Sequence, residues 1–483
     1  MVLDVRQSQS PRLADGTSLE DAVDLAARKI AGNVFADPLI YRVELERVFA
    51  RSWCFVGFDS EIPGSGDYVT RPMGNDSVLL TRDSAGSVNV LLNSCTHRGT
   101  QLSVIDKGSC EQFKCPYHGW IFDTTGRLDA LIAERERLGP DGSKDAFNLR
   151  RAKVSTYAGM IFATWNRDAP DLDAYLGDAK WYMDLPFRSV DDSLVVTGPP
   201  HRWTVRCNWK FGAENFAGDV YHVMGAHASA ATIGLVPPSS ISASLGQVTV
   251  ADTTWGHGVT TFNIPRSLGG QQIEQSVLRQ LQFPWLPEEV LPQLENHLND
   301  GQLELLQAGE FPGVGNIFPN FSWIMQASPF GPLALIRTWH PVGPGQVEVW
   351  SWSLAHPDAS DELRHASIKT HARLFGMAGM LEEDDVTIWS RIQRAREGYI
   401  GGQQQVDYSC RRQPDKSRYV PDGRDWPGPG TVWQGRVADA VADDAMWNFY
   451  LRWYQLMTEP CDGNGPTTAA DGSAHLAAAD RWR

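Results

Sequence analysis

The chain has 483 residues, of which 42% are hydrophobic and 21% are charged, and its formal net charge is −15 at pH 7. This composition is typical of a globular protein that is long enough for two domains. The excess of acidic residues argues against binding to nucleic acid or to an anionic membrane, and the polar N-terminus and the lack of long apolar runs predict a cytoplasmic protein.

The first third of the chain predicts a small unit made of β-strands. Residues 20–31 have helical periodicity, but short alternating stretches follow from about residue 51. Such stretches, separated by turn residues, occur at 77–83 and 87–93 around Ser84-Ala85-Gly86, at 120–131 with a turn at Thr125-Gly126, and at 157–166. The stretches around the two turns predict hairpins, and the last stretch predicts a buried strand. We therefore expect an all-β domain over residues 45–166.

The rest of the chain predicts a domain that mixes helices and strands. Helical patterns occur at residues 172–185, 208–228, 361–395 and 442–457, and strand-like alternation occurs in FSWIM (321–325), LALIRTW (333–339) and VEVWSWSL (347–354). We expect an α+β fold: the small domain is inserted near the N-terminus of a larger domain, residues 1–44 and 167–460, whose antiparallel sheet is covered by helices. Residues 461–483 are rich in Gly, Ala and Thr, which predicts a disordered tail.

Two short segments each combine a cysteine with a histidine, as Cys95-x-His97 and Cys115-x-x-His118. The seven cysteines of the chain are scattered and odd in number, so a close Cys/His group is better explained as a metal site than as part of a disulfide framework. Zinc fingers usually pair like ligands, whereas each segment here supplies one thiolate and one imidazole. The mixed pattern favours a [2Fe–2S] cluster held by a cysteine pair and a histidine pair, with a structural zinc site as the alternative. Cys110, between the two segments, is expected to be a packed thiol.

A second group of metal-ligand residues lies in the predicted helix 208–228. Asp219 and His222 are three residues apart on one helical face, so the carboxylate can orient the imidazole. His222 and His227 are separated by about 140° around an ideal helix, so the helix must be distorted, for instance by a π-bulge, or must end near His227 if both are to reach one metal. Two histidines need a harder third ligand to form the facial triad of a mononuclear Fe(II) oxygenase. The acidic run in GMLEEDDVTIW (379–389) offers one, although such a run is by default a solvated helix face.

Both groups resemble the motifs of one enzyme family. The segments CTHRG and CPYHGW are similar to a Rieske iron–sulfur motif, and the acidic run resembles the segment that carries the carboxylate ligand in Rieske oxygenases. Matched position by position, Asp385 is that ligand and Asp384 is its neighbour. From about residue 35 to 460 the chain resembles the large (α) subunit of Rieske non-haem iron ring-hydroxylating dioxygenases, in the branch that handles naphthalene, biphenyl and polycyclic arenes.

The resemblance implies an oxidoreductase with two iron cofactors. The implied ligands are Cys95, His97, Cys115 and His118 for a [2Fe–2S] Rieske cluster, and His222, His227 and Asp385 for a mononuclear Fe(II). Electrons from NAD(P)H pass through a reductase and a ferredoxin to the cluster and then to the iron, where both atoms of O2 are added to one face of an arene to give a cis-dihydrodiol. The resemblance also implies a small β subunit in an α3β3 assembly with α subunits arranged head to tail. Asp219 then bridges a Rieske histidine of the neighbouring subunit, His118, to its own His222.

The family positions also imply a substrate pocket. The side chains expected near the iron are Asn215, Phe216, Val223, Val314, Phe375 and Leu381. Relatives often carry a histidine at the position of Val314 and an aromatic residue at the position of Leu381. We therefore expect a roomier and more apolar pocket, suited to an aromatic hydrocarbon.

Three alternatives are left open by the sequence. An aromatic acid such as phthalate would need a cationic partner in the pocket, for which Arg206, Arg337 and Arg373 are candidates. A monooxygenase or demethylase of the same superfamily is the second alternative, and the naphthalene-like stretch GAENFAGDVYH weighs against it. The third is a Rieske electron-transfer protein with a structural second domain, which would carry two irons per chain where the oxygenase carries three.

Overall fold

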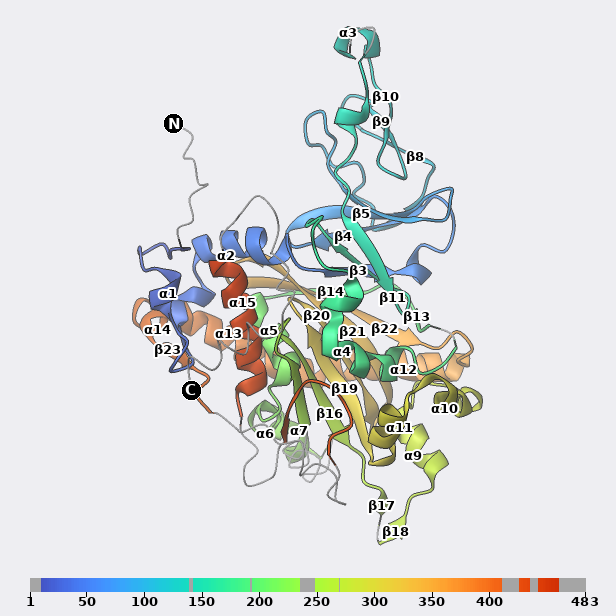
Figure 1. The fold of residues 1–483 in the computed structure, drawn as a ribbon, viewed down its shortest axis with the longest axis vertical. Helices are drawn as coiled ribbons and strands as arrows, with labels where there is room; N and C mark the ends of the chain where they lie inside the picture. Colours follow the sequence, from blue (N-terminus) through green and yellow to red (C-terminus); the bar gives the residue numbers. More distant parts are fainter. Residues whose placement is uncertain are drawn as a thin grey trace. The chain divides into compact units, whose positions relative to one another are not determined.

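The computed structural model describes residues 10–138, 142–191, 193–234, 248–268, 270–410, 425–434 and 442–459. They form two compact units (Figure 1): a small unit, Phe49–Leu172, and a large unit that combines the described residues before and after it. The sequence predicts the smaller domain over residues 45–166. The expected disordered tail, residues 461–483, lies outside the described residues.

The small unit consists of three antiparallel sheets. Their strand orders are β6 (Val88–Leu92), β5 (Asp76–Arg82), β4 (Asp67–Met73), β7 (Lys107–Ser109); β11 (Lys153–Tyr157), β12 (Met160–Thr164), β3 (Cys54–Phe58); and β10 (Leu128–Ala130), β9 (Ile121–Asp123), β8 (Gln112–Lys114). Both predicted hairpins are confirmed, as β5–β6 and β9–β10, and β12 is the buried strand predicted within 157–166. A short helix, α3 (Glu134–Leu138), follows β10, and two 3₁₀ turns lie at Asp59–Glu61 and Asp145–Phe147.

The large unit is built on a nine-stranded antiparallel sheet. Its order is β13 (Val195–Val196), β22 (Gln346–Ala355), β21 (Gly331–Gly343), β20 (Phe321–Ser328), β19 (Glu310–Ile317), β16 (His257–Asn263), β15 (Val248–Asp252) and β24 (Thr431–Gln434), with β14 (His201–Val205) also paired to β22. The three strands predicted from alternation are β20, β21 and β22, where Trp323, Trp339 and Trp352 are buried. Short strands elsewhere are β1 (Val23–Asp24), β2 (Lys29–Ala31) and β23 (Gln405–Asp407) in one sheet, and β17 (Ser267–Leu268) with β18 (Gln271–Gln272) in another.

Helices cover this sheet. In chain order the described ones are α1 (Leu19–Ala22), α2 (Pro38–Glu44), α4 (Leu172–Phe187), α5 (Trp209–Gly218), α6 (His222–Ala226), α7 (Ala228–Thr232), α9 (Gln275–Gln282), α10 (Leu294–His297), α11 (Asp300–Gln307), α12 (Asp361–Phe375), α13 (Met380–Arg396), α14 (Tyr399–Gln403) and α15 (Asp444–Thr458), with 3₁₀ or π turns at Gly32–Phe35, Leu45–Phe49 and Glu288–Gln293. Helix α5 packs on β16 and β19, α12 packs on β21 and β22, and α15 packs on α5. The predicted α+β architecture is confirmed, and none of the helices named here is long and apolar enough to cross a membrane.

Helix α5 lies unusually close to the sheet. A Cβ atom on Gly212 would come within 2.4 Å of the Trp339 ring, and one on Gly258 of β16 would come within 2.0 Å of the Ala217 carbonyl oxygen. Only glycine fits at either position without displacing its neighbour, because real Cβ atoms do not approach other atoms so closely. The sheet therefore fixes α5, whose C-terminal end leads into the Asp219–His227 segment.

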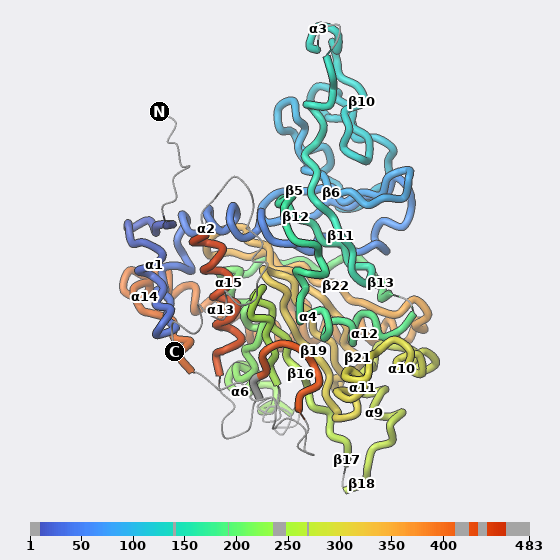
Figure 2. The backbone as a smooth tube through the Cα atoms, viewed as in Figure 1, coloured from blue at the N-terminus to red at the C-terminus, as the bar shows by residue number. Residues whose placement is uncertain are grey.

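Three predicted helices differ from the structure. Residues 20–31 form only the single turn α1 before β1 and β2, because Ile30 is buried and β2 pairs with the distant β23, so that early and late segments lie side by side (Figure 2). Residues 208–228 break after Gly218, and residues 361–395 break between Phe375 and Met380. The prediction at 442–457 is confirmed by α15, and that at 172–185 is confirmed by α4 apart from a non-helical kink at Gly177. Periodicity misses such breaks because contacts elsewhere in the chain override local preference.

Candidate functional site

The two Cys/His segments form loops with the same backbone pattern. In the first, the Cys95 N–H donates to the Thr100 carbonyl at 2.9 Å, and the Gly99 N–H donates to the Cys95 carbonyl at 2.8 Å. In the second, the Cys115 N–H donates to the Trp120 carbonyl at 2.7 Å, and the Gly119 N–H donates to the Cys115 carbonyl at 3.0 Å. Each loop closes through a glycine with positive φ, 78° at Gly99 and 66° at Gly119. The sequence thus places two equivalent thiol–imidazole pairs in two equivalent turns.

The four side chains of these loops suit a metal cluster. Cys95 and Cys115 are buried in an apolar group with Leu79, Phe113 and Trp120, and Cys110 packs against the same group, as expected. The His97 and His118 ring centroids are 4.5 Å apart, and His97 stacks on Trp120 at 4.8 Å. Both Nδ1 atoms are shielded from solvent and have no hydrogen-bond partner among the described residues. Desolvation and the nearby His118 and Arg137 lower the pKa of His97, which keeps its imidazole neutral. Two thiols and two unpaired imidazole nitrogens are the donor set of a Rieske [2Fe–2S] cluster.

A second site forms where the predicted helix 208–228 breaks. Helix α5 ends at Gly218, Asp219 to Tyr221 form a turn, and α6 begins with His222. His227 joins α6 to α7. The reorientation that brings both histidines to one point is therefore a break before His222 together with a helix end at His227, not a π-bulge. The two rings lie 5.2 Å apart at 75° to each other.

Asp385 of α13 completes this site. Its Oδ1 lies 3.7 Å from His222 Nε2 and 3.5 Å from His227 Nε2. One donor atom from each of the three side chains lies within 4.8 Å of the others, which is close enough for all three to contact one metal ion. Two imidazoles and one carboxylate are the ligands of the facial triad, which leaves coordination positions open.

The Nδ1 atom of each histidine, which faces away from Asp385, makes a hydrogen bond that fixes the ring. The His222 Nδ1–H donates to the backbone carbonyl of Asp219, whose carboxylate Oδ1 is 3.9 Å away. The backbone carbonyl of Asp219 therefore makes the hydrogen bond, and an orienting role of its carboxylate stays a prediction. The His227 Nδ1–H donates to Asp384 Oδ2 at 3.3 Å, and the Ser229 hydroxyl donates to the same carboxylate oxygen at 3.1 Å. These contacts aim both Nε2 atoms toward Asp385.

The electrostatics of the triad favour a cation. Burial raises the pKa of Asp385 to about 7, with Glu382 and Asp219 adding to the rise and His222 opposing it. Burial and the neighbouring His222 lower the pKa of His227 to about 4, so its imidazole is neutral. A carboxylate that is costly to ionise gains most from a divalent cation at the common point, because the cation stabilises the ionised form.

The acidic run on α13 is not a solvated face. Glu382 and Asp385 are buried, whereas Glu383 is exposed. Glu382 accepts a hydrogen bond from the Arg337 guanidinium at 2.7 Å, and both side chains are fully buried, at 1% and 0% exposure. The alternative of a surface charge run is therefore wrong for this segment.

The six expected pocket residues come from five elements: α5, α6, β19, α12 and α13. Phe216 and Phe375 are buried, whereas Asn215, Val223, Val314 and Leu381 are partly exposed. The Arg337 guanidinium lies 5.3 Å from the Phe216 ring centroid and 5.6 Å from that of Phe375, so the two rings flank one buried cation. That these six side chains line a substrate pocket stays a prediction.

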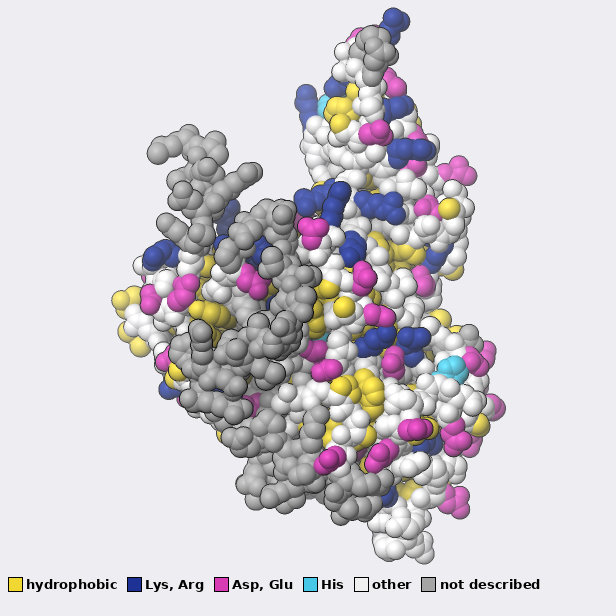
Figure 3. All heavy atoms as spheres, viewed as in Figure 1, with side chains coloured by type: hydrophobic (Ala, Val, Ile, Leu, Met, Phe, Trp, Pro, Cys, Tyr) yellow, Lys and Arg dark blue, Asp and Glu magenta, His cyan; other side chains and the backbone are white. Residues whose placement is uncertain are grey.

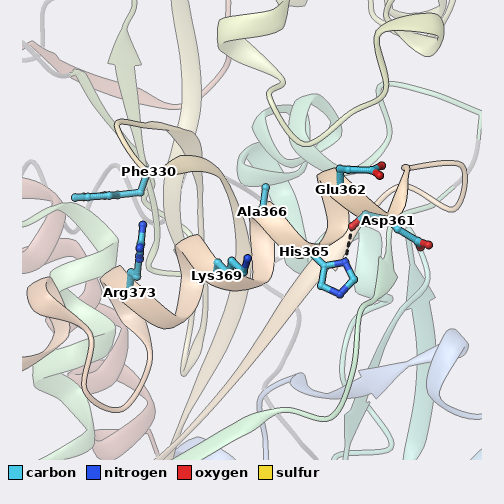
Figure 4. Close-up of a pocket in the computed structure, with 7 residues that line it drawn as sticks. All are labelled: Phe330, Asp361, Glu362, His365, Ala366, Lys369 and Arg373. Atoms are coloured by element: carbon cyan, nitrogen blue, oxygen red, sulfur yellow. Dashed lines mark hydrogen bonds between the residues drawn. The ribbon is translucent and has the colours of Figure 1, made fainter.

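The arginines considered for an aromatic acid have other partners. Arg337 pairs with Glu382, and Arg206, which is 63% exposed, pairs with Glu397 at 2.5 Å. Arg373 lies on the exposed face of α12, with its guanidinium 5.7 Å from the Phe330 ring centroid, at a surface hollow of about 650 Å³ (Figure 4). None of the three offers an unpaired cation beside the triad in the described structure.

The polar contacts that α5 makes with distant segments were not predicted from the sequence. Lys210 forms an ion pair with Glu44, which also accepts hydrogen bonds at 2.9 Å from the indole N–H groups of Trp209 and Trp453. The Tyr408 hydroxyl donates to Glu214 at 2.7 Å. These partners lie more than 160 residues apart along the chain, so no local pattern could have found them.

Comparison with known proteins agrees with both sites. Residues 52–147 match the Rieske [2Fe–2S] domain, and residues 172–447 match the ring hydroxylating alpha subunit (catalytic domain). The chain belongs to the ring-hydroxylating α-subunit family. The first match contains all four Cys/His residues, and the second contains the whole triad.

Members of the ring-hydroxylating family align over most of the chain. An N,N-dimethyl phenylurea N-demethylase subunit alpha from Sphingobium sp. is 34% identical, over 87% of this chain and 93% of that protein. A chlorobenzene dioxygenase subunit alpha from Cupriavidus sp. is 33% identical, over 90% and 92%. The crystal structure of naphthalene 1,2-dioxygenase from Rhodococcus sp. bound to indole matches with a TM-score of 0.78 at 33% identity, over 90% of this chain and 95% of that one.

These matches confirm the expected family, fold and enzyme class. They also confirm the cofactors, a Rieske [2Fe–2S] cluster and a non-haem iron. Which residues bind each cofactor stays a prediction, which the unpaired Nδ1 atoms and the convergent triad support.

Proposed function

We propose that this ring-hydroxylating α subunit is the terminal oxygenase that cis-dihydroxylates an aromatic hydrocarbon with O2 and electrons from NAD(P)H. The proposed iron ligands are His222, His227 and Asp385, and the proposed cluster ligands are Cys95, His97, Cys115 and His118. The observation that carries the proposal is the convergence of the triad. Its three side chains come from two separate segments, residues 222–227 and α13, and meet at one point.

The side chains around the triad have distinct tasks. The iron, when bound, supplies the position at which O2 is activated. The Asp219 carbonyl and the Asp384 carboxylate hold the two imidazoles with Nε2 toward the metal. Three protein ligands leave positions for O2, and Phe216 and Phe375 give the arene an apolar surface from which water is excluded.

We infer that electrons reach the iron from the cluster of a neighbouring subunit. The Asp219 side chain is 23% exposed, which leaves part of it open to a hydrogen bond from the neighbour's His118, while its Oδ1 is shielded from solvent and lies 3.9 Å from His222 Nδ1. Exposed cations lie near the cluster histidines, among them Arg98 and Arg137, and Figure 3 shows Lys and Arg side chains along the small unit. The small unit has nearly equal numbers of acidic and basic residues, so most of the net charge of −15 belongs to the large unit.

The cations beside the cluster histidines and the negative net charge of the large unit favour this head-to-tail contact. A ring of three such contacts closes without leaving an unpaired surface, which supports the α3β3 assembly with a small β subunit. Membership of the family implies a β subunit, a ferredoxin and a reductase in general terms. A cytoplasmic location fits these NAD(P)H-dependent partners.

The substrate is proposed to be a mono- or polycyclic hydrocarbon. The pairing of Arg337 with Glu382 and of Arg206 with Glu397 argues against a carboxylate-bearing substrate such as phthalate. A demethylase is the second candidate, because one relative of 34% identity is an N-demethylase subunit alpha. The sequence likeness to dioxygenases is of similar extent, at 33%.

Product analysis tests these functions. The oxygenase, reconstituted with a ferredoxin and a reductase, is supplied with naphthalene, phenanthrene, biphenyl, phthalate or N,N-dimethyl phenylurea under ¹⁸O2. The proposal predicts an arene cis-diol that carries two ¹⁸O atoms, and no diol from the Asp385→Ala variant. Demethylated phenylurea without any diol would support the second candidate, and oxidation of phthalate alone would contradict the hydrocarbon assignment.

A further inference from the structure

Arg337 occupies a position that no motif marks. It lies on β21, an inner strand of the large sheet between β22 and β20, and is fully buried. One guanidinium nitrogen donates to Glu382 Oε2 at 2.7 Å, and another donates to the Phe375 carbonyl at 3.1 Å. Four aromatic rings surround its Cζ atom at centroid distances of 5.3 to 5.8 Å, those of Trp203, Phe216, Trp339 and Phe375.

This one side chain therefore ties two helices to the sheet. Phe375 is the last residue of α12, and Glu382 lies in the first turn of α13. Between them runs a short glycine-containing link, Gly376 to Gly379, in which the Gly379 N–H donates to the Gly376 carbonyl at 2.8 Å. The planar fork of the guanidinium bonds both sides of the link at once, which lysine cannot do.

This arrangement fixes the position of Asp385. It follows Glu382 by three residues, so the two carboxylates are one helical turn apart and move together with the start of α13. Asp384, which holds His227, belongs to the same turn. A shift of α13 relative to the sheet would change the 3.5 and 3.7 Å distances from Asp385 to the two imidazoles.

Stability alone does not account for such a pair. A buried ion pair often contributes no more to stability than apolar side chains of similar size, because both charges lose their water. We propose that the Arg337–Glu382 ion pair positions the carboxylate ligand: it fixes the start of α13 so that Asp385 reaches the point shared by His222 and His227. This inference rests on the proposed iron site and makes Arg337 a positioning residue that does not contact the metal.

The test replaces the pair without leaving a buried charge. In the double variant Arg337→Met/Glu382→Leu, apolar side chains occupy the space of the ion pair. The single variants Arg337→Met and Glu382→Leu each leave one charged partner buried and unpaired. The matched control is Arg71→Met/Glu61→Leu, which removes another buried ion pair, in the small unit. Three quantities are measured on cluster-loaded enzyme: the Tm, the dissociation constant for Fe(II) from the electron paramagnetic resonance signal of its nitric oxide complex, and the share of electrons recovered in product instead of hydrogen peroxide.

The single variants should lose thermal stability, and the double variant Arg337→Met/Glu382→Leu should regain most of it. Only Arg337→Met/Glu382→Leu should still bind Fe(II) more weakly, on the order of 10-fold or more, and release more peroxide. Wild-type Fe(II) affinity and coupling in that variant would overturn the inference. If the double variant does not fold, Arg337→Lys provides the test, because lysine keeps the charge but loses one of the two hydrogen bonds. Unchanged Fe(II) affinity of Arg337→Lys would also overturn the inference. A wild-type enzyme without the nitric oxide signal would instead refute the proposed iron site.

Discussion

Replacing Asp219 with asparagine should separate the proposed electron bridge from the iron site itself. Asparagine keeps the backbone carbonyl that accepts the His222 Nδ1–H. The contact from Asp219 Oδ1 to His222 Nδ1, at 3.9 Å with both side chains partly exposed, is too long for a hydrogen bond and contributes at most about 1 kcal/mol. Iron affinity should therefore change by about fivefold or less.

Turnover should fall much further. The proposed contact from Asp219 to the neighbour's histidine is a charge-assisted hydrogen bond of roughly 1.5–3 kcal/mol, and its loss lowers the rate by about 10- to 150-fold. Stopped-flow oxidation of the pre-reduced cluster, in the presence of O2 and arene, measures this step, and metal analysis measures the iron. Asp384→Asn is the contrasting control, since it should weaken iron binding but leave the bridge. Normal coupled turnover of Asp219→Asn would refute the bridging role.

Three further outcomes can be checked. Burial raises the pKa of Glu310 from 4.5 to about 7, so the folded chain holds a proton that the unfolded chain has lost, and wild-type stability should fall relative to Glu310→Gln as pH rises from about 5 to 8. A difference in Tm that is constant over this range would contradict this shift. Gly119→Ala, at φ 66°, should cost about 1–2 kcal/mol of unfolding free energy and reduce cluster content, measured by visible absorbance. Gly86→Ala, at φ 82° in a hairpin, should cost the same unfolding free energy without loss of the cluster. An equal loss of cluster in both variants would argue against a role for the Gly119 loop. Val314→Phe and Leu381→Phe should each lower the amount of diol formed from phenanthrene relative to that formed from naphthalene. An unchanged ratio of the two diols would exclude these positions from the pocket.

The parts of the site that lie close together in sequence were predictable. The two Cys/His loops follow from spacing alone, and the register of Asp385 in the acidic run came from its likeness to the family. The helix break at Asp219 to Tyr221 was not predictable in this way, because the GAENFAGDVYH stretch keeps its helical periodicity through the point where the helix ends.

Contacts between distant segments were not predictable. Arg337 contacts Glu382 across 45 positions of the sequence, and each of these charged residues, considered alone, would be expected at the surface. Asp384 appeared only as the neighbour of a ligand, although it holds His227. Residues 29–31 had helical periodicity but form a strand, because their partners are residues 405–407. In each case the partner that decides the structure is far along the chain.

The central claim is that one chain holds a two-iron cluster and a separate iron at His222, His227 and Asp385. Iron and acid-labile sulfide per chain, measured for the wild type and for Asp385→Ala, test it most directly. Three irons and two sulfides are expected in the wild type, and two irons with unchanged sulfide are expected in the variant. Two irons in the wild type, or three in the variant, would contradict it.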